Sequence, residues 1–571
     1  MKQVLKILNA LKWLIGLVVV FTLANAVMDL LIPTFMAAII DSGIKNQNFN
    51  LIIEYGIYML LAALGSIAFA LLSVYFDSLI ASRFAFNLRG KVFEKAINFS
   101  QQNLNEIGSS SLITRNTNDA MQVMQFTMMA LRMILRAPSI AIGGLSLATT
   151  INRDLTFILL IAVAVLALVI VIFFIALLPI TKKLQEKLDK LNAVVREKLT
   201  GVRVIRAFNN DEFERQRFAK TNLELNQVTL KSMYINMLIN PLINIVTSFT
   251  TVGMLYFGAI QVNAGNLEVG QLVAVIQYIT MILMSIIMMV VVFVMGPRAI
   301  TSLKRIIEVI NATNHVVDGE DTSDVTFTNS IVFKDVSFAY PKSNQSVLKN
   351  LNLKIKKGEV TAIIGSTGSG KSSIIRLLMR FYDYNAGSIT IDNQELKSLK
   401  QAKIRDLIGF VSQKPQLFSG TILSNLKFAG NQQVATFEKA LSLAAASEFT
   451  KEKGGLEASI EQAGVNFSGG QKQRLSIARA LAKDPSILIF DDAFSALDYQ
   501  TEAKIFNNLK TQLKDKTIII VAQRISSIKN ADQIIVLDNG RIVGSGKHLD
   551  LVKTNPIYKE IVESQSAKEE Q

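Results

Sequence analysis

The first 300 residues consist of long apolar runs separated by short or basic connections, whereas the residues beyond about 328 have mixed polarity. A helix needs about 20 apolar residues to cross the hydrocarbon core of a bilayer, which is roughly 30 Å thick. Stretches of this length occur at 14–40, 55–79, 128–150, 155–178, 236–262 and 270–296. One such stretch could be a buried core helix, but six in one half of a chain predict an all-α membrane domain with six transmembrane helices.

The basic residues indicate which ends of these helices face the cytoplasm. Long basic connections lie at 80–127 and 180–235, whereas the other three connections carry almost no Lys or Arg. By the positive-inside rule, the long connections, both termini and the second half of the chain are cytoplasmic. The net charge of +15 is explained in this way, and no nucleic-acid partner is expected. Residues 1–13 are basic with apolar positions at helical spacing, and either lie along the membrane surface or simply lead into the first span.

Composition excludes two kinds of site. The chain has no cysteine, so neither a disulfide framework nor a thiolate metal site can form. No cleavable signal peptide is expected, because the first apolar run is too long for one.

Both long connections continue the helical pattern beyond membrane length. The helices are therefore expected to project into the cytoplasm and to reverse at tips near 99–121 and 201–218. Gly108 and Gly201 are the residues expected to mark the two reversals, because glycine favours turns. The expected organisation is an N-terminal segment, a six-helix domain, a linker and a soluble domain, at 1–13, 14–300, 301–328 and 329–571.

The soluble domain contains a phosphate-binding pattern. The stretch "GEVTAIIGSTGSGKSSIIRLLMRF" predicts a strand, a glycine loop and a helix, and it contains G-x-x-x-x-G-K-[ST] in the context that this motif requires. Backbone N–H groups of such a loop point at phosphate oxygens, and the helix adds its positive end. The predicted loop residues are Gly365, Ser366, Thr367, Gly368, Ser369, Gly370, Lys371 and Ser372, followed by Ser373.

Three residues have predicted roles in this α/β P-loop domain. Lys371 reaches the β- and γ-phosphates of ATP, and the hydroxyl of Ser372 binds Mg²⁺. Asp491 ends the strand "ILIFD" and holds the same Mg²⁺, directly or through water. ATP and Mg²⁺ are therefore the expected cofactors.

A second glycine-rich anion nest lies upstream of "ILIFDD". It comprises Phe467, Ser468, Gly469, Gly470 and Gln471. Hydroxyl and backbone N–H groups before a helix can bind an anion. Since one nucleotide does not need two phosphate nests from one domain, this nest is expected to face an ATP held by another domain. The alternative is an ordinary glycine-rich turn before a helix.

Together these features resemble a half-transporter of the ATP-binding cassette (ABC) exporter class, with six spans followed by one nucleotide-binding domain. The resemblance implies that Tyr340 stacks on adenine, that Gln413 senses magnesium and touches the membrane half, and that Asp498 belongs to a loop reaching the opposite site. It also implies that the tips at 99–121 and 201–218 are coupling helices and that the protein lies in a bacterial cytoplasmic membrane.

Three positions depart from the pattern of an active cassette, the weakest being Gln462 and Ala463 before the glycine nest, where many family members carry Glu-Arg. Asp492 stands where the family places a catalytic Glu, and Gln523 stands where it places a switch His. The only two histidines, His315 and His548, lie elsewhere. Shortening Glu to Asp withdraws the carboxylate by roughly 1.5 Å, one carbon–carbon bond, and a misplacement near 1 Å can cost about 10²-fold in rate. Glutamine is neutral and cannot carry a proton.

These departures predict a chain that binds ATP well and hydrolyses it poorly. Its whole "FSGGQ" then serves the ATP of a partner half-transporter that supplies Glu and His, as in bacterial heterodimeric multidrug exporters. Three alternatives stay open: a slow homodimeric exporter, a lipid or peptide exporter, and a nucleotide-gated regulatory subunit.

The expected cargo is an amphiphilic compound, because the spans are apolar and rich in methionine, which repacks around varied ligands. Intramembrane polar residues are costly and therefore informative. Asp29 in the first span would suit a cationic amphiphile if unpaired, or could be a satisfied carboxylate facing a vestibule. Asn240 and Asn244 in the fifth span are further candidates.

Overall fold

The computed structural model describes residues 2–321, 325–343, 345–430 and 432–569. Its contacts divide the chain into two compact units. The first comprises Met1–Ala96 and Ser110–Asn311, and the second comprises Ile97–Ser109 and Ala312–Gln571.

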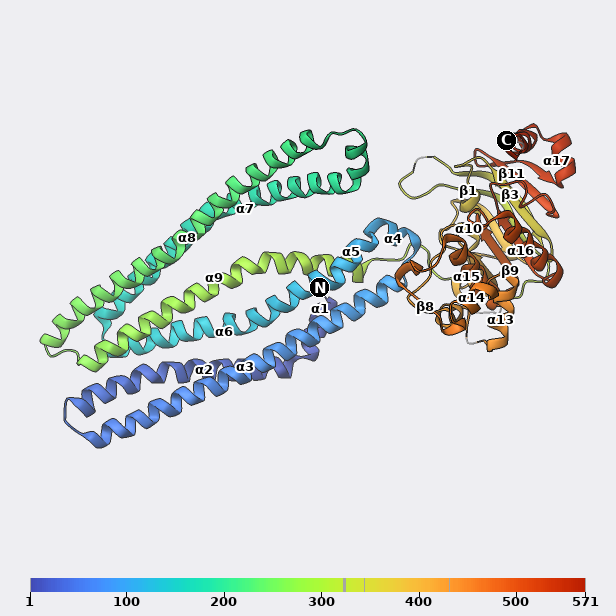
Figure 1. The fold of residues 1–571 in the computed structure, drawn as a ribbon. Coiled ribbons are helices and arrows are strands. Elements are labelled where there is room, and N and C mark those ends of the chain that lie inside the picture. The colour runs from blue at the N-terminus through green and yellow to red at the C-terminus, as the bar shows by residue number, and fades with distance from the viewer. Residues whose placement is uncertain (1, 322–324, 344, 431, 570–571) are drawn as a thin grey trace. The chain divides into compact units, whose positions relative to one another are not determined.

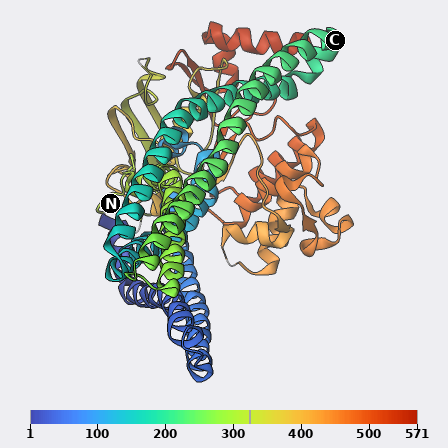
Figure 2. The ribbon, with the colours of Figure 1, turned by 90° about the vertical axis from the view of Figure 1, so that its left-hand side faces the viewer.

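The first unit is all-α (Figures 1 and 2). Its elements are α1 (Lys2–Ala10), α2 (Lys12–Ala38), the π-helical η1 (Ile39–Ile44), α3 (Phe49–Ile97), α5 (Ser109–Thr114), η2 (Arg115–Asp119), α6 (Ala120–Ile151), α7 (Arg153–Ala207), α8 (Asp211–Asn263) and α9 (Val269–Asn311). Within the described residues, six helical segments are long and apolar enough to cross a membrane, which confirms the six-span prediction. At a rise of 1.5 Å per residue, α7 is about 80 Å long, far more than a bilayer requires.

Helix packing follows a simple pattern. α6 packs along α9, α7 along α8, and α2 against both α6 and α9. In Figure 1 the C-terminal end of α7 and the N-terminal start of α8 lie apart from α6 and α9. At the opposite end, Asp41 accepts hydrogen bonds from the backbone N–H groups of Gly270 (2.6 Å) and Gln271 (3.0 Å), so it caps the start of α9. A Cβ on Gly270 would lie 2.4 Å from the carbonyl oxygen of Ala37, so only glycine permits this approach.

The two expected turn glycines behave differently. Gly108 ends α4 (Gln101–Ile107) with a φ of 81°, which confirms its role as a turn residue. The prediction for Gly201 is wrong, because this residue lies inside α7. One glycine costs a helix about 1 kcal/mol relative to alanine, which is too little to end a helix this long. The reversal lies at the next non-helical residues instead, where Asn209 has a φ of 50°.

The second unit is an α/β domain with three sheets. A four-stranded antiparallel sheet has the order β2-β1-β4-β5, and a six-stranded sheet has the order β12-β11-β3-β10-β9-β6. The strands are β1 (Ser330–Phe338), β2 (Leu348–Lys356), β3 (Val360–Gly365), β4 (Ala386–Ile391), β5 (Gln394–Glu395), β6 (Ile408–Val411), β7 (Gly420–Thr421), β8 (Ser459–Ile460), β9 (Ile487–Asp491), β10 (Thr517–Val521), β11 (Gln533–Asp538) and β12 (Arg541–Gly546). β7 and β8 form the third, two-stranded sheet.

Helices surround these sheets in the second unit (Figure 1). They are α4, α10 (Lys371–Leu378), α11 (Gln401–Asp406), α12 (Ile422–Leu426), α13 (Val434–Leu443), α14 (Ser447–Glu452), α15 (Gly469–Ala482), α16 (Tyr499–Gln512), α17 (His548–Thr554) and α18 (Pro556–Glu569). β10 is buried along its whole length, and its continuous apolar run is typical of a central parallel strand. β10 pairs in parallel with both β3 and β9, so the carboxyl ends of these three strands meet at one edge.

The structure also describes the start of the expected linker and the first expected tip. α9 continues to Asn311, so residues 301–311 of the expected linker are helical. α4, from the first expected tip, belongs to the same compact unit as the ATP-binding fold. Ser100 starts α4 by accepting a hydrogen bond from the backbone N–H of Asn103.

Candidate nucleotide-binding site

A pocket of about 380 Å³ lies where β3, β9 and β10 end. Ligands in open α/β sheets bind outside the carboxyl ends of the strands. The residues lining it are Tyr340, Val347, Thr367, Gly368, Gly370, Lys371, Ser372, Ser373, Arg376, Gln413, Asp491, Asp492, Val521 and Gln523. The fold therefore brings together most of the sequence-predicted ATP-site residues. Some of them, such as Tyr340 and Asp491, are about 150 residues apart along the chain.

The glycine loop between β3 and α10 has a backbone that other residues could not adopt. Gly370, at the start of α10, has a φ of 104°, and a Cβ there would lie 2.8 Å from Cδ2 of Leu348. A Cβ on Gly365 would lie 2.0 Å from the carbonyl oxygen of Leu537. The buried hydroxyl of Ser369 has no hydrogen-bond partner among the described residues. The loop is thus shaped as a cradle with an unused donor, as a phosphate ligand requires.

Lys371 folds back onto this loop. Its Nζ donates to the carbonyl oxygens of Gly365 and Ser366, both at 2.8 Å. Burial lowers the pKa of Lys371, and the nearby carboxylates of Asp492 and Asp491 oppose this effect. A partly buried ammonium that bonds only to neutral carbonyls is well placed to pair with an incoming phosphate.

The predicted magnesium ligands lie together. The hydroxyl of Ser372 donates to Oδ1 of Asp491 at 2.9 Å. Burial raises the pKa of Asp491, and the hydrogen bond from Ser372 acts in the opposite direction. A hydroxyl and a carboxylate are the hard oxygen ligands that Mg²⁺ prefers, so these residues fit the ion. When bound, Mg²⁺ would neutralise charge on the phosphates.

Asp492 is held by two glutamines. Its Oδ2 accepts hydrogen bonds from the side-chain amides of Gln413 (3.0 Å) and Gln523 (2.8 Å). A carboxylate oxygen has two lone-pair sites, so both sites of Oδ2 are occupied. The backbone of Asp492 lies in the left-handed region, with a φ of 51°. Aspartate tolerates this region better than most residues.

Tyr340 lies at the side of the pocket, against the helix that follows the phosphate loop. Its hydroxyl hydrogen-bonds with that of Ser373 (2.9 Å) and accepts from the Arg376 guanidinium (2.8 Å). Its ring makes an edge contact with Tyr382, with the centroids 5.2 Å apart. The tyrosine is therefore fixed beside the phosphate loop, where the sequence predicts adenine stacking.

The second glycine nest starts α15 and does not line this pocket. Ser468 forms a capping box with Gln471, in which each side chain bonds to the backbone N–H of the other. Ser468 and Gly469 are exposed, whereas Phe467 is buried. Asp498 caps α16 by accepting from the backbone N–H of Thr501 at 2.9 Å, and this bond lowers its pKa. The role of these residues at an opposite nucleotide stays a prediction.

Comparisons with known proteins agree with this site. The family model for the ABC transporter transmembrane region matches residues 15–296, and the ABC transporter model matches residues 348–495. An ABC transporter ATP-binding protein of Mycobacterium tuberculosis is 36% identical over 559 residues, covering 97% of this chain and 96% of that protein. One from Bacillus subtilis is 33% identical over 573 residues, covering 100% and 99%. The chain belongs to the ABC transporter family.

The fold of this ABC transporter also has a solved counterpart. The structure of a bacterial Atm1-family ABC exporter with ATP bound matches it with a TM-score of 0.81, over 98% of this chain and 99% of that chain. Because the two sequences are 24% identical, this likeness concerns the fold alone: a six-helix membrane domain followed by an α/β ATPase domain.

Two contacts of the ABC transporter's ATPase domain were not predicted. The side chain of Gln565, in α18, accepts from the backbone N–H of Ile525 (2.8 Å) and donates to the carbonyl oxygen of Gln523 (2.7 Å). The amide of Asn105, in α4, donates to the hydroxyl of Tyr382 (2.9 Å). Neither contact has a local sequence signal, because each joins segments that are distant along the chain.

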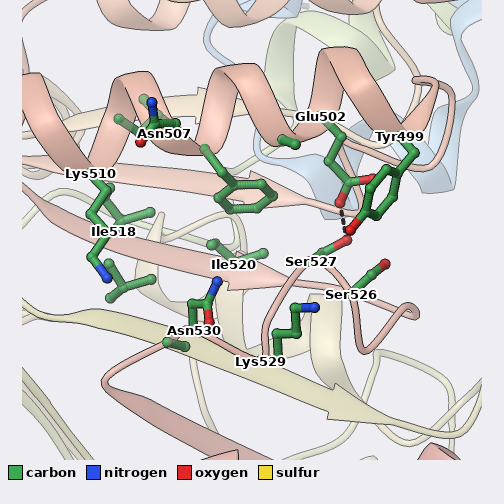
Figure 3. Close-up of a pocket in the computed structure, with 15 residues that line it drawn as sticks. Tyr499, Glu502, Asn507, Lys510, Ile518, Ile520, Ser526, Ser527, Lys529 and Asn530 are labelled. Atoms are coloured by element: carbon green, nitrogen blue, oxygen red, sulfur yellow. Dashed lines mark hydrogen bonds between the residues drawn. The ribbon is translucent and has the colours of Figure 1, made fainter.

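Figure 3 shows a second pocket, of about 230 Å³, whose lining includes Ser526 and Ser527. Its walls are α16, β10 and residues 526–531. Glu502 is 4% exposed and accepts a hydrogen bond from the hydroxyl of Ser527. Its other carboxylate oxygen is buried without a partner among the described residues, and burial raises the pKa of Glu502. The pocket is therefore lined by a buried carboxyl group that has one hydrogen bond and one unpartnered oxygen.

The predicted cargo residues are not brought together. Asp29 is paired, since its Oδ2 lies 2.8 Å from Nη2 of Arg136 and its Oδ1 accepts from the hydroxyl of Ser66 at 2.5 Å. The unpaired-carboxylate interpretation is therefore wrong, because two neighbouring helices supply donors. Asn240 and Asn244 are exposed on α8, next to Pro241.

Proposed function

We propose that this ABC transporter chain is one half of a heterodimeric exporter of amphiphilic compounds in a bacterial cytoplasmic membrane, with an ATP site of its own that binds nucleotide and hydrolyses it slowly. The observation that carries the proposal is the double hydrogen bond to Oδ2 of Asp492, from Gln413 and Gln523. Hydrolysis needs a carboxylate oxygen that is free to polarise the attacking water.

Three features weaken Asp492 as a base. Its side chain is shorter than that of Glu by roughly 1.5 Å. The amides of Gln413 and Gln523 occupy both lone-pair sites of its Oδ2, so this oxygen has no site left for the attacking water. At the switch position, Gln523 can donate a hydrogen bond but cannot carry a proton. The groups that bind ATP, including Lys371 and Tyr340, are unaffected by these changes.

The glycine nest supports the paired arrangement. Ser468 and Gly469 are exposed at the start of α15 and outside the lining of this chain's own pocket. A second cassette can therefore place its ATP phosphates against them, since helix N-termini bind anions. A chain with a weakened base and an intact glycine nest can complete the ATP site of a partner that supplies Glu and His.

The test uses the full chain, alone and with the product of the neighbouring gene. We expect the chain alone to hydrolyse ATP very slowly and the pair to hydrolyse it at a rate set by the partner's Glu. In the pair, Asp492→Asn changes the rate little, whereas the matching change in the partner abolishes it. Brisk hydrolysis by the chain alone would establish a homodimer and overturn the proposal.

A further inference from the structure

A small cavity in the membrane domain contains two arginines. It has a volume of about 190 Å³, and it lies between α6 and α9. Its lining residues are Arg132, Met133, Arg136, Ala137, Ile140, Ser285 and Met288. Arginine inside a membrane span is costly, so its presence there indicates a function.

The two arginines differ in their partners. The charge of Arg136 is neutralised by Asp29, whose carboxylate lies 2.8 Å away. Arg132 lies one turn before Arg136 on the same helix, and in the described part of the chain it makes no hydrogen bond or ion pair. The cavity is therefore lined by one guanidinium that forms an ion pair and by one that, among the described residues, forms neither an ion pair nor a hydrogen bond.

Asp77 is the competing explanation for Arg132. This α3 residue is 1% exposed, and both of its carboxylate oxygens are buried without a donor among the described residues. Arg132 acts on Asp77 only through space, without a hydrogen bond. Because Asp77 is sealed from the cavity whereas Arg132 lines it, a ligand in the cavity reaches the arginine and not the aspartate.

The remaining lining suits an apolar group. Met133, Ala137, Ile140 and Met288 form most of the wall, and methionine adapts to ligands of different shape. A guanidinium forms paired, charge-assisted hydrogen bonds with carboxylate and phosphate groups. A cationic head group would instead be repelled by Arg132.

We infer that this cavity binds the anionic head group, a carboxylate or a phosphate, of the amphiphile that the transporter carries, and that Arg132 is the residue that pairs with it. The inference rests on the proposed function for the statement that the cargo is an amphiphile. It replaces the expectation of a cationic cargo at Asp29.

The test measures binding to the full chain in lipid nanodiscs without hydrolysis. Three probes share one tail: dodecyl phosphate, dodecanoate and dodecyltrimethylammonium. Each competes with a dansyl-labelled undecanoic acid, whose fluorescence reports occupancy. We expect both anions to compete about tenfold or more better than the cation, since hydrogen bonds to charged groups are strong. The better of the two anions identifies the head group.

Variants assign the effect to Arg132. Arg132→Gln is expected to weaken anion binding about tenfold or more while the cation is unaffected, and Arg132→Lys retains part of the anion preference. Arg83→Gln, at an exposed position of α3, is the matched control and leaves all three affinities unchanged. Unchanged ATP binding by each variant shows that it is folded.

Two results would overturn the inference: equal competition by the three probes, or unchanged anion binding in Arg132→Gln. Failure of the proposed function has a different signature. If the chain carries no amphiphile, no probe binds saturably. If its ATP site is fully active, the ATPase assay shows it while the probe affinities stay as expected here.

Discussion

The side-chain amide of Gln523 donates a 2.8 Å hydrogen bond to Oδ2 of Asp492, and both residues line the pocket at the ends of β3, β9 and β10. Gln413 donates to the same oxygen at 3.0 Å. The two departures from the family pattern, Asp492 and Gln523, therefore meet at one atom, Oδ2 of Asp492. The proposed slow hydrolysis rests on this arrangement, because a short carboxylate held by two amides is poorly placed to remove a proton from water.

Restoring the usual pair of residues should activate the site. We expect Asp492→Glu combined with Gln523→His to raise ATP turnover at this chain's site by about 10²-fold, because the longer carboxylate recovers the lost reach. The measurement is ATPase activity in a complex whose partner site is inactivated. Lys371→Ala is the control that removes nucleotide binding at this site. An unchanged rate in the double variant would mean that something else limits hydrolysis here.

Gln565, in α18, should stabilise the segment from Gln523 to Ile525, with whose backbone it forms two hydrogen bonds. Gln565→Ala removes both the acceptor for the backbone N–H of Ile525 and the donor to the carbonyl oxygen of Gln523. We expect the Ile525 amide hydrogen to exchange with solvent roughly fivefold faster, since one hydrogen bond contributes about 1 kcal/mol.

Two further variants define this effect. Gln565→Glu keeps the acceptor for Ile525 and is expected to preserve most of the protection while losing the bond to Gln523. Ser564→Ala, at the exposed neighbouring position, is the matched control. Equal exchange in all variants would show that α18 does not hold the segment.

The contact between Asn105 and Tyr382 should couple α4 to the nucleotide site. Tyr382 touches the ring of Tyr340, and Asn105 donates to its hydroxyl. We expect Asn105→Ala and Tyr382→Phe each to reduce the stimulation of ATPase activity by cargo, by about fivefold, and the double variant to be no worse than either. Fully additive losses would show that the two residues act independently. ATP binding itself should stay unchanged.

Glu502 should make stability depend on pH. Its pKa is raised by burial, so the folded protein binds this proton more readily than the unfolded chain does. The stabilisation is complete below the ordinary pKa of glutamate and is lost as the pH rises through the raised value. At pH 7.5 we therefore expect Glu502→Gln to unfold at a higher temperature than the wild type.

The difference in unfolding temperature should narrow as the pH falls through the raised pKa of Glu502 and should close below the ordinary pKa of glutamate, where the side chain is neutral in both the folded and the unfolded chain. Circular dichroism of the full chain follows the transition. Glu438→Gln, on the exposed face of α13, is the control and should show no such trend. A difference that does not change with pH would exclude titration of Glu502 as its cause.

Local patterns in the sequence were enough for the fold and for the phosphate loop. Apolar runs of membrane length predict spans directly, and the residues from Gly365 to Ser372 are adjacent along the chain, so their spacing predicts their geometry. Asp491 was also predictable, because it ends a buried apolar strand.

Contacts between distant segments were not predictable. The joint attachment of Gln413 and Gln523 to Asp492 depends on the order of strands in the sheet. The pairing of Asp29 with Arg136 depends on how α2 packs against α6, over 107 positions of sequence. The prediction of a turn at Gly201 is wrong because a glycine weakens a helix only slightly. The packing of α7 against α8 outweighs that cost.

The most direct test of the slow ATP site measures what remains bound there. The complex of this chain and its partner is incubated with Mg²⁺ and 8-azido-ATP labelled at the α-phosphate, chased with unlabelled ATP, cross-linked by light and separated into subunits. We predict that the nucleotide on this chain is intact ATP that survives the chase and that the partner carries ADP. The pair Asp492→Glu and Gln523→His should convert this chain's label to ADP. Equal conversion to ADP on both wild-type subunits would contradict the proposal.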